Sequence, residues 1–268
     1  MNDSKYGWKP DIPDCRDWPF RPSRGNKAEL PEKASLKHIM PPVYKQGSIG
    51  DCTAHAVVSL YVYHHVSSGG KRFTPSPMFV YYNTRMLENT TQIDCGASIR
   101  SAIKATVKYG VCNYECWPSD ETKLRTRPYK RCYTQAQKKP TIEYFRVDQS
   151  LHNIRVCLFQ NKPVACGIAA YESYELPQVA RTGFIDRPAF TERCLGGHAI
   201  VLTGYDDTTN LFEFRNSHGS EWGIDGYGTI PYSYILDRYL SDDFWTINHV
   251  EPLNYEATSE NQTGRVKG

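Results

Sequence analysis

Apolar side chains cover nearly all faces of the run from residue 54 to residue 66, which predicts a helix that is buried on most sides. The valines and tyrosines of this run would also suit a strand. Its length, the capping type of residue at Asp51 and the stop at Gly69-Gly70 favour the helix. Cys52 would then lie in the first helical turn.

Three further segments have helical signals. Ser76-Pro77 matches a cap and a first helical position, which predicts a helix through about Leu87. A second helix is predicted to end at Gly110; its buried stripe would consist of Ile99, Ala102, Ile103 and Val107. A third is predicted over 151–160.

The second half of the chain has a different pattern. Short runs rich in β-branched and aromatic residues, separated by turn residues, predict strands. These runs cover 163–170, 198–205, 211–215, 227–230 and 244–248. Helices in the first half and a sheet in the second half together indicate an α+β fold.

The pattern divides the chain into four parts. Residues 1–34 carry Trp8, Trp18 and Phe20 among several prolines, which predicts an extended arm rather than a helix. The arm is either a structural part of the fold or a detachable cover of the site. A mainly helical lobe over 35–140 would end in a polar connection after Trp117-Pro118. A mainly β lobe would cover 141–250, and residues 251–268 are predicted to form a frayed polar tail.

Composition excludes several classes of partner. Of 268 residues, 40% are hydrophobic and 23% are charged, as is usual for a globular protein. The net charge is only +3 and no basic block stands out, which argues against a nucleic acid as the main partner. The sequence shows no signal-peptide pattern at its start and no apolar run of about 20 residues, so no membrane span is expected.

Nine cysteines form an odd set, which leaves at least one unpaired thiol. Cys112 and Cys116, together with Cys132, could suggest a metal site, but their spacing matches no familiar zinc pattern. Structural thiols or a local disulfide are the simpler interpretation, and the pairing of the eight cysteines other than Cys52 stays open.

Cys52 is the candidate nucleophile. A helix N-terminus favours an anion, and a thiolate is such an anion. The alternative is a buried cysteine that merely opens a core helix. The second half supplies a base and its partner: His198 follows Gly196-Gly197 at the mouth of an apolar strand, and Asn216 ends a strand before a glycine-rich loop.

These motifs resemble the papain and cathepsin cysteine peptidases. Gln46-Gly47 before Cys52, then Gly-Gly-His ending at 198, then Asn216-Ser217 with Trp222-Gly223, occur in the chain order of that family. The segment from Gly7 to Asp17 also resembles the leading segment of a compact branch found in bacteria, archaea and giant viruses. The resemblance covers about residues 36–250.

The resemblance implies a two-lobed papain-like fold with the active site in the cleft between a helical lobe and an antiparallel β lobe. Cys52 would be the nucleophile, His198 the general base and acid, and Asn216 the partner that orients His198. Gln46 and the backbone N–H of Cys52 would form the oxyanion hole. The pKa of Cys52 should then lie well below about 8.5. The implied substrate-binding residues are Gly96, Ala97, Gly197 and Trp222.

The implied protein is a monomeric peptidase that acts on extended peptides through a thioester and needs no cofactor or metal. A viral member of this branch would act in the virion or in a host endolysosomal compartment. The arm would inhibit the enzyme and be displaced on activation. The preference of the subsites, and whether the enzyme cleaves within chains or at their ends, stay open.

Several positions depart from the family pattern. Asp51 replaces a serine, and its charge opposes thiolate formation although its capping geometry helps. His218 replaces a shielding tryptophan, which would leave the His198–Asn216 hydrogen bond wetter and weaker. Ile49 replaces a disulfide cysteine, and Thr53 replaces an aromatic residue.

Three rival hypotheses remain. His55, three residues after Cys52, could serve as the base, although no partner is evident to orient it. The chain could be an inert papain-fold binding module. It could also be a transglutaminase-like acyl transferase, which Gln46 and the Trp222-Gly223 motif disfavour.

Overall fold

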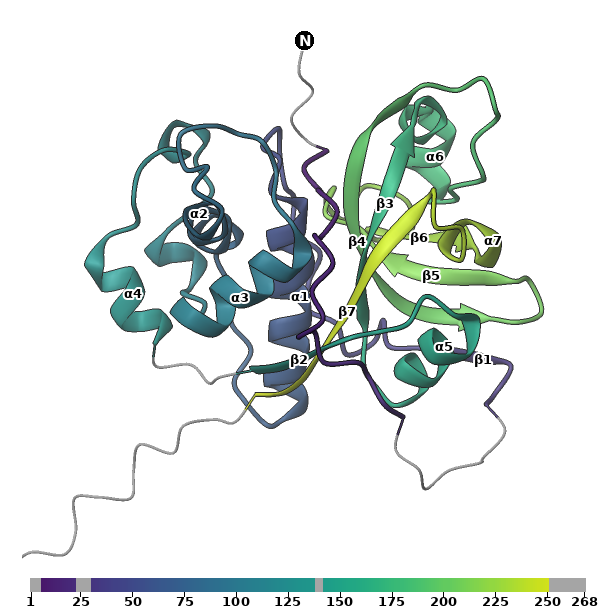
Figure 1. The fold of residues 1–268 in the computed structure, drawn as a ribbon, viewed down its shortest axis with the longest axis horizontal. Helices are drawn as coiled ribbons and strands as arrows, with labels where there is room; N and C mark the ends of the chain where they lie inside the picture. Colours follow the sequence, from purple (N-terminus) through teal and green to yellow (C-terminus); the bar gives the residue numbers. More distant parts are fainter. Residues whose placement is uncertain (1–5, 23–29, 138–141, 251–268) are drawn as a thin grey trace, which may run out of the picture.

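The computed structural model describes residues 6–22, 30–137 and 142–250, and the side chains of 249–250 are left out of the description. Helices gather on one side and a large antiparallel sheet on the other, with the long helix α1 (Cys52–Ser67) between them (Figure 1). The predicted α+β class is confirmed. Residues 251–268, predicted to be a frayed tail, lie outside the described residues.

Helix α1 forms as the sequence predicts. Every residue from Cys52 to His64 is buried. The helix contacts α2 and α3 on one side and strands β3, β4 and β7 on the other. A helix that is apolar all round is stable only when it is enclosed in this way.

The flanking helices owe their starts to serine caps. In α2 (Pro77–Leu87), Ser76 Oγ accepts a hydrogen bond from the N–H of Phe79 at 3.0 Å. Ser98 caps α3 (Ile99–Tyr109) and Ser150 caps α5 (Leu151–Phe159) in the same manner. Gly110 ends α3 with φ of 74°, a conformation that favours glycine. Val107, predicted to be buried, is 37% exposed.

Among the described residues, seven strands form one antiparallel sheet in the order β2-β7-β3-β4-β5-β6, with β1 paired to β4. In the register, His198 lies opposite Ile168 and Arg215 lies opposite Val201. This pairing brings the end of β5, and therefore Asn216, beside the middle of β4. The strands are β1 (Lys33–Ser35), β2 (Ile142–Arg146), β3 (Val164–Tyr171), β4 (Cys194–Asp206), β5 (Leu211–Arg215), β6 (Tyr227–Pro231) and β7 (Ser241–Val250).

The structure adds short elements that the sequence pattern did not predict. Helix α4 (Lys130–Ala136) lies in the stretch that was expected to be an irregular connection. Two more are α6 (Pro177–Thr182) and α7 (Tyr232–Ile235). Three 3₁₀ turns are η1 (Tyr114–Cys116), η2 (Glu121–Lys123) and η3 (Glu172–Glu175). All are shorter than the windows in which periodicity can be recognised.

Residues 6–22 and 30–34 of the arm are described and contain no helix; residues 6–22 run between the helices and the sheet (Figure 1). Lys33 and Ala34 belong to β1 and pair with β4. Phe20 is buried, and its N–H donates to the carbonyl of Arg146 at 2.7 Å. Trp18, by contrast, is 73% exposed. No helix within the described ranges is long and apolar enough to cross a membrane.

Candidate active site

Cys52 opens α1 and is fully buried. Burial raises the pKa of its thiol to about 12, although hydrogen bonds with the backbones of Ala199 and Gly7 act to lower it. The expected low pKa is therefore wrong for this closed conformation, because loss of hydration outweighs the helix N-terminus. The contact with Ala199 brings the sulfur to the residue that directly follows His198, which is 146 positions after Cys52 in the chain.

Asp51 adds to the raised pKa. It precedes α1 but makes no side-chain capping hydrogen bond, and its charge raises the pKa of Cys52. Its carboxylate instead lies 3.5 Å from the Nε2 atom of His55, and both side chains are buried. In the described part of the chain neither side chain has a hydrogen-bond partner, so this contact places His55 against Asp51 without a hydrogen bond to orient its ring.

His198 and Asn216 form a close pair. Nε2 of His198 lies 2.9 Å from Oδ1 of Asn216. The backbone N–H of Ser217 also donates to Oδ1, at 2.8 Å, which fixes the oxygen end of the amide toward the imidazole. Asn216 is only 3% exposed. The expected wet and weakened bond is therefore not found.

His218 lies against the pair from the loop that follows β5. Its ring stacks on His198 with centroids 5.0 Å apart and an interplanar angle of 24°. Its Nε2 atom is 3.1 Å from the hydroxyl of Tyr174. Trp222, expected to bind substrate, is 8% exposed and stacks on Tyr174 at 6.2 Å. This burial leaves almost no surface for a substrate, so Trp222 supports the neighbouring rings instead.

Gln46 lies beside the approach to α1. Its Nε2 atom donates to the carbonyl of Ile49 at 2.7 Å, and its Oε1 atom accepts from the hydroxyl of Ser217 at 2.8 Å. The second bond joins the segment before the nucleophile to the residue after Asn216. The side chain is 3% exposed, so its amide is held in one orientation.

The arm passes between the residues predicted to bind substrate. The N–H of Trp8 donates to the carbonyl of Gly197 at 2.8 Å. Ala97 bonds the arm on the other side, accepting from Lys9 at 3.0 Å and donating to Gly7 at 2.8 Å. The arm thus takes the extended, backbone-paired position that was expected for a peptide substrate.

Glycines allow this close approach. A Cβ atom on Gly7 would lie 1.9 Å from the carbonyl oxygen of Gly50. A Cβ on Gly167 would lie 1.9 Å from the indole of Trp8, and one on Gly197 would lie 2.7 Å from it. No side chain fits at such distances, so these positions shape a space that the indole fills.

Two buried carboxylates anchor the arm. Oδ2 of Asp243 accepts from the indole N–H of Trp8 at 3.1 Å and from the backbone N–H of Asp11 at 2.7 Å. Asp11 in turn accepts from the indole N–H of Trp245 at 2.7 Å. Burial, reinforced by the charge of Asp11, raises the pKa of Asp243 to about 7. Burial likewise raises the pKa of Asp11.

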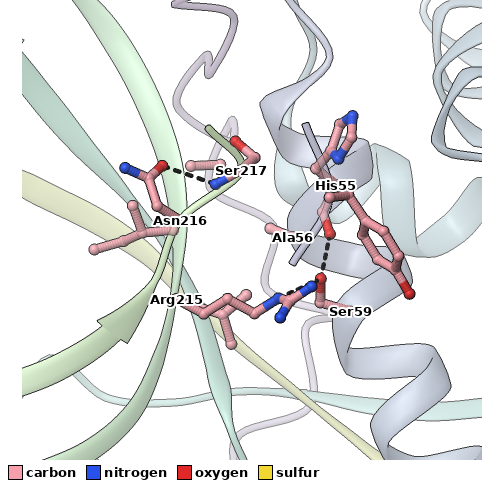
Figure 2. A pocket seen from close by; sticks show the side chains of 10 residues that line it. His55, Ala56, Ser59, Arg215, Asn216 and Ser217 are labelled. Carbon is pink, nitrogen blue, oxygen red and sulfur yellow. Dashed lines mark hydrogen bonds between the residues drawn. The ribbon is translucent and has the colours of Figure 1, made fainter. Parts of the chain in front are cut away.

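Arg215 joins the two sides of the molecule directly before Asn216. Its guanidinium donates to Ser59 of α1 at 3.1 Å and to the carbonyl of Pro41 at 2.6 Å. Figure 2 shows it reaching across to Ser59, beside a cavity of about 10 Å³ that His55 and Asn216 also line. The guanidinium of Arg215 fixes the distance between β5 and α1. It therefore also fixes the distance between Asn216 and the nucleophile helix.

The remaining cysteines are free thiols in the described ranges, which include all nine. The sulfur atoms of Cys116 and Cys132 lie 3.2 Å apart. No group of three histidine, cysteine or acidic side chains in the described residues is arranged to hold a metal ion.

Sequence reasoning missed Tyr174, Asp243 and Arg215. Their contacts join residues far apart in the chain: Tyr174 bonds Asn216, Asp243 bonds Trp8, and Arg215 bonds Ser59. No local pattern marks such a contact.

The chain is similar to a known protein family and to several known proteins. Residues 30–235 match the family described as papain family cysteine protease. An uncharacterized peptidase C1-like protein of Acanthamoeba polyphaga mimivirus is 36% identical over 214 residues, which cover 76% of this chain and 69% of the relative. A cathepsin B-like protein of Giardia intestinalis is 24% identical over 220 residues, which cover 75% of this chain and 69% of that protein.

Among solved structures, xylellain, a cysteine protease from Xylella fastidiosa, superposes with a TM-score of 0.86 at 36% identity. The match covers 93% of this chain and 98% of xylellain. Procathepsin L 3 of Tenebrio molitor matches with a TM-score of 0.68 at 16% identity, covering 91% of this chain and 76% of the other, and supports the fold alone.

Proposed function

The chain belongs to the papain family of cysteine proteases, and we propose that it hydrolyses peptide bonds through Cys52, His198 and Asn216. The observation that carries the proposal is the hydrogen bond of 2.9 Å between His198 and Asn216, with Ala199 in contact with the sulfur of Cys52. The supporting residues come from α1, β4 and the end of β5, as the reaction requires of a nucleophile, a base and its orienting partner.

The chemistry proceeds in two steps. His198 takes the proton of Cys52 as the sulfur attacks the peptide carbonyl carbon, whose oxygen becomes an oxyanion. The side-chain amide of Gln46 and the backbone N–H of Cys52 stabilise that oxygen. The C–N bond then breaks, His198 protonates the leaving amine, and a thioester remains. Water, deprotonated by His198, hydrolyses the thioester and restores the thiol.

We also propose that the arm holds the enzyme as an inhibited zymogen. Residues 1–34 would be the inhibitory arm, of which 6–22 occupy the cleft between the lobes 35–140 and 141–250, while Lys33 and Ala34 pair with β4. Gly7 and Trp8 pair with both Ala97 and Gly197, where a substrate would have to bind. The thiol beneath them has a pKa of about 12 and is therefore protonated at neutral pH.

An epoxide thiol inhibitor tests the catalytic proposal. We expect it to add one equivalent of label to the wild-type chain after the arm is displaced, together with hydrolysis of a fluorogenic peptide. Cys52→Ala should lose both label and hydrolysis, because the epoxide reacts with the thiolate that the proposed pairing of Cys52 with His198 supplies. Cys166→Ala, which removes another buried thiol, is the matched control. Labelling and hydrolysis that persist in Cys52→Ala would reject the proposal.

A further inference from the structure

Tyr174 lies where the aromatic rings around the site meet. It belongs to η3, directly after β3, and is 5% exposed. Its ring is 5.7 Å from that of His198 and 6.2 Å from that of Trp222. Tyr6 of the arm approaches it edge-on at 5.9 Å. None of the motifs in the sequence marks this residue.

The hydroxyl of Tyr174 makes two polar contacts. It accepts a hydrogen bond from Nδ2 of Asn216 at 2.9 Å, and it lies 3.1 Å from Nε2 of His218. At the opposite end of the same amide, Oδ1 accepts from Ser217 and faces His198. The amide of Asn216 is therefore fixed at its nitrogen end as well as at its oxygen end.

We propose that Tyr174 is a positioning residue for catalysis, whose hydroxyl fixes the amide of Asn216 and through it the imidazole of His198. The inference rests on the proposed catalytic roles of Cys52, His198 and Asn216. With Oδ1 toward Nε2, a neutral His198 carries its proton on Nε2. The lone pair on Nδ1 is then the one that receives the proton of Cys52.

His218 completes the hydrogen-bond chain. When the Tyr174 hydroxyl donates to Nε2 of His218, its oxygen becomes a better acceptor for Asn216, because hydrogen bonds in series polarise one another. This arrangement requires a neutral His218. A charged ring 5.0 Å from His198 would repel the imidazolium that forms during the reaction. The titratable groups that face Tyr174 are His198, His218, Cys52, Tyr6 and Tyr234.

Tyr174→Phe tests the proposal, because it removes the hydroxyl and keeps the ring. The variant is made in the full-length chain, in a Gly7→Ala background that displaces the arm. We expect kcat/KM for a fluorogenic peptide to fall by about tenfold, through kcat rather than KM. The pH profile of iodoacetamide alkylation at Cys52 should shift upward by about one unit, the equivalent of a tenfold change. A role confined to packing would leave this midpoint unchanged.

Tyr232→Phe is the matched control, since it removes another tyrosine hydroxyl, one that donates to Asp207 at 2.9 Å. If Tyr174→Phe moves kcat and the alkylation midpoint no more than Tyr232→Phe does, the proposal is wrong. Thermal melting shows whether each variant is folded. Alkylation needs no turnover, so a shifted midpoint in a chain that hydrolyses nothing would support the positioning role while rejecting the proposed hydrolysis.

A double-mutant cycle gives an independent test. Tyr174→Phe and His218→Phe should each break the same series of hydrogen bonds. The double variant should therefore lose little more activity than the more impaired single variant. Fully additive losses would contradict a shared hydrogen-bond chain.

Discussion

Replacing Gly7 by alanine should open the cleft and raise the alkylation rate of Cys52 by roughly 10³. The new Cβ would lie 1.9 Å from the carbonyl oxygen of Gly50, and backbone cannot move aside as a side chain can. The arm would therefore lift. Three backbone hydrogen bonds with Ala97 and Gly197 would be lost, each contributing about 1 kcal/mol. Burial of the Trp8 ring contributes a further ~1.5 kcal/mol or more.

The measurement is the rate of iodoacetamide alkylation at pH 7, followed by mass spectrometry, with peptide hydrolysis measured in parallel. Opening the cleft returns water to the sulfur, so the largest cause of the raised pKa is removed. Lys9→Ala is the matched control, because Lys9 is also in the arm, two residues after Gly7, and its side chain is exposed. Equal rates for wild type and Gly7→Ala would mean that the arm does not limit access.

Much of the fold is readable from local pattern. The apolar run after Cys52 has no polar face, so only a helix enclosed on all sides accommodates it. Strand β5 occurs over 211–215, as the alternation and its turns predict. Helix α4 was missed because its seven residues are mostly polar and Tyr129 provides no side-chain cap. Arg100, which is not part of the predicted apolar stripe, is nevertheless buried and donates to Asp17 of the arm at 2.7 Å.

The residues of the candidate site were easier to predict than their pKa values and their long-range contacts. Motif order indicated Cys52, His198 and Asn216. The low pKa expected for Cys52 followed from the helix N-terminus and the neighbouring His198, whereas the raised pKa depends on burial of the thiol, which contacts the backbone of Gly7, 45 residues earlier in the chain. Similarly, no local feature shows that Asp11 and Asp243 approach each other, since they are 232 positions apart in the chain.

The contact between Asp11 of the arm and Asp243 makes the docking of the arm depend on pH. The docked state holds Asp243 with a pKa of about 7, because the site is buried and Asp11 adds a negative charge. Once the arm leaves, Asp243 loses the charge of Asp11 and gains water, so its pKa falls toward the ordinary 3.8. The docked state thus binds more protons, and its added stability is complete below the ordinary pKa and is lost as pH rises through about 7.

The neighbouring charges limit the pH dependence of arm docking without reversing its direction. Arg146 lies 3.2 Å from Asp243 and 3.1 Å from Asp242, so one cation faces several carboxylates. Arg100 pairs with Asp17 of the arm. One proton taken up on docking changes the docking constant by at most tenfold per pH unit. Between pH 5 and pH 7 the arm should therefore loosen by up to about 10².

Hydrogen exchange at the amides of Trp8 and Lys9, corrected for the intrinsic rate at each pH, measures this loosening without involving the thiol. Wild type should lose protection steadily from pH 5 to pH 7. Asp243→Asn, which suits the positive φ of 60° at this position and carries no charge, should show a much shallower profile, because only Asp11, whose pKa burial also raises, still titrates there. Asp242→Asn, on the adjacent and more exposed carboxylate, is the control and should retain the slope. If Asp243→Asn keeps a slope of equal size, the titrating group is another residue. If the slope is reduced, deprotonation of Asp243 releases the arm as the pH rises.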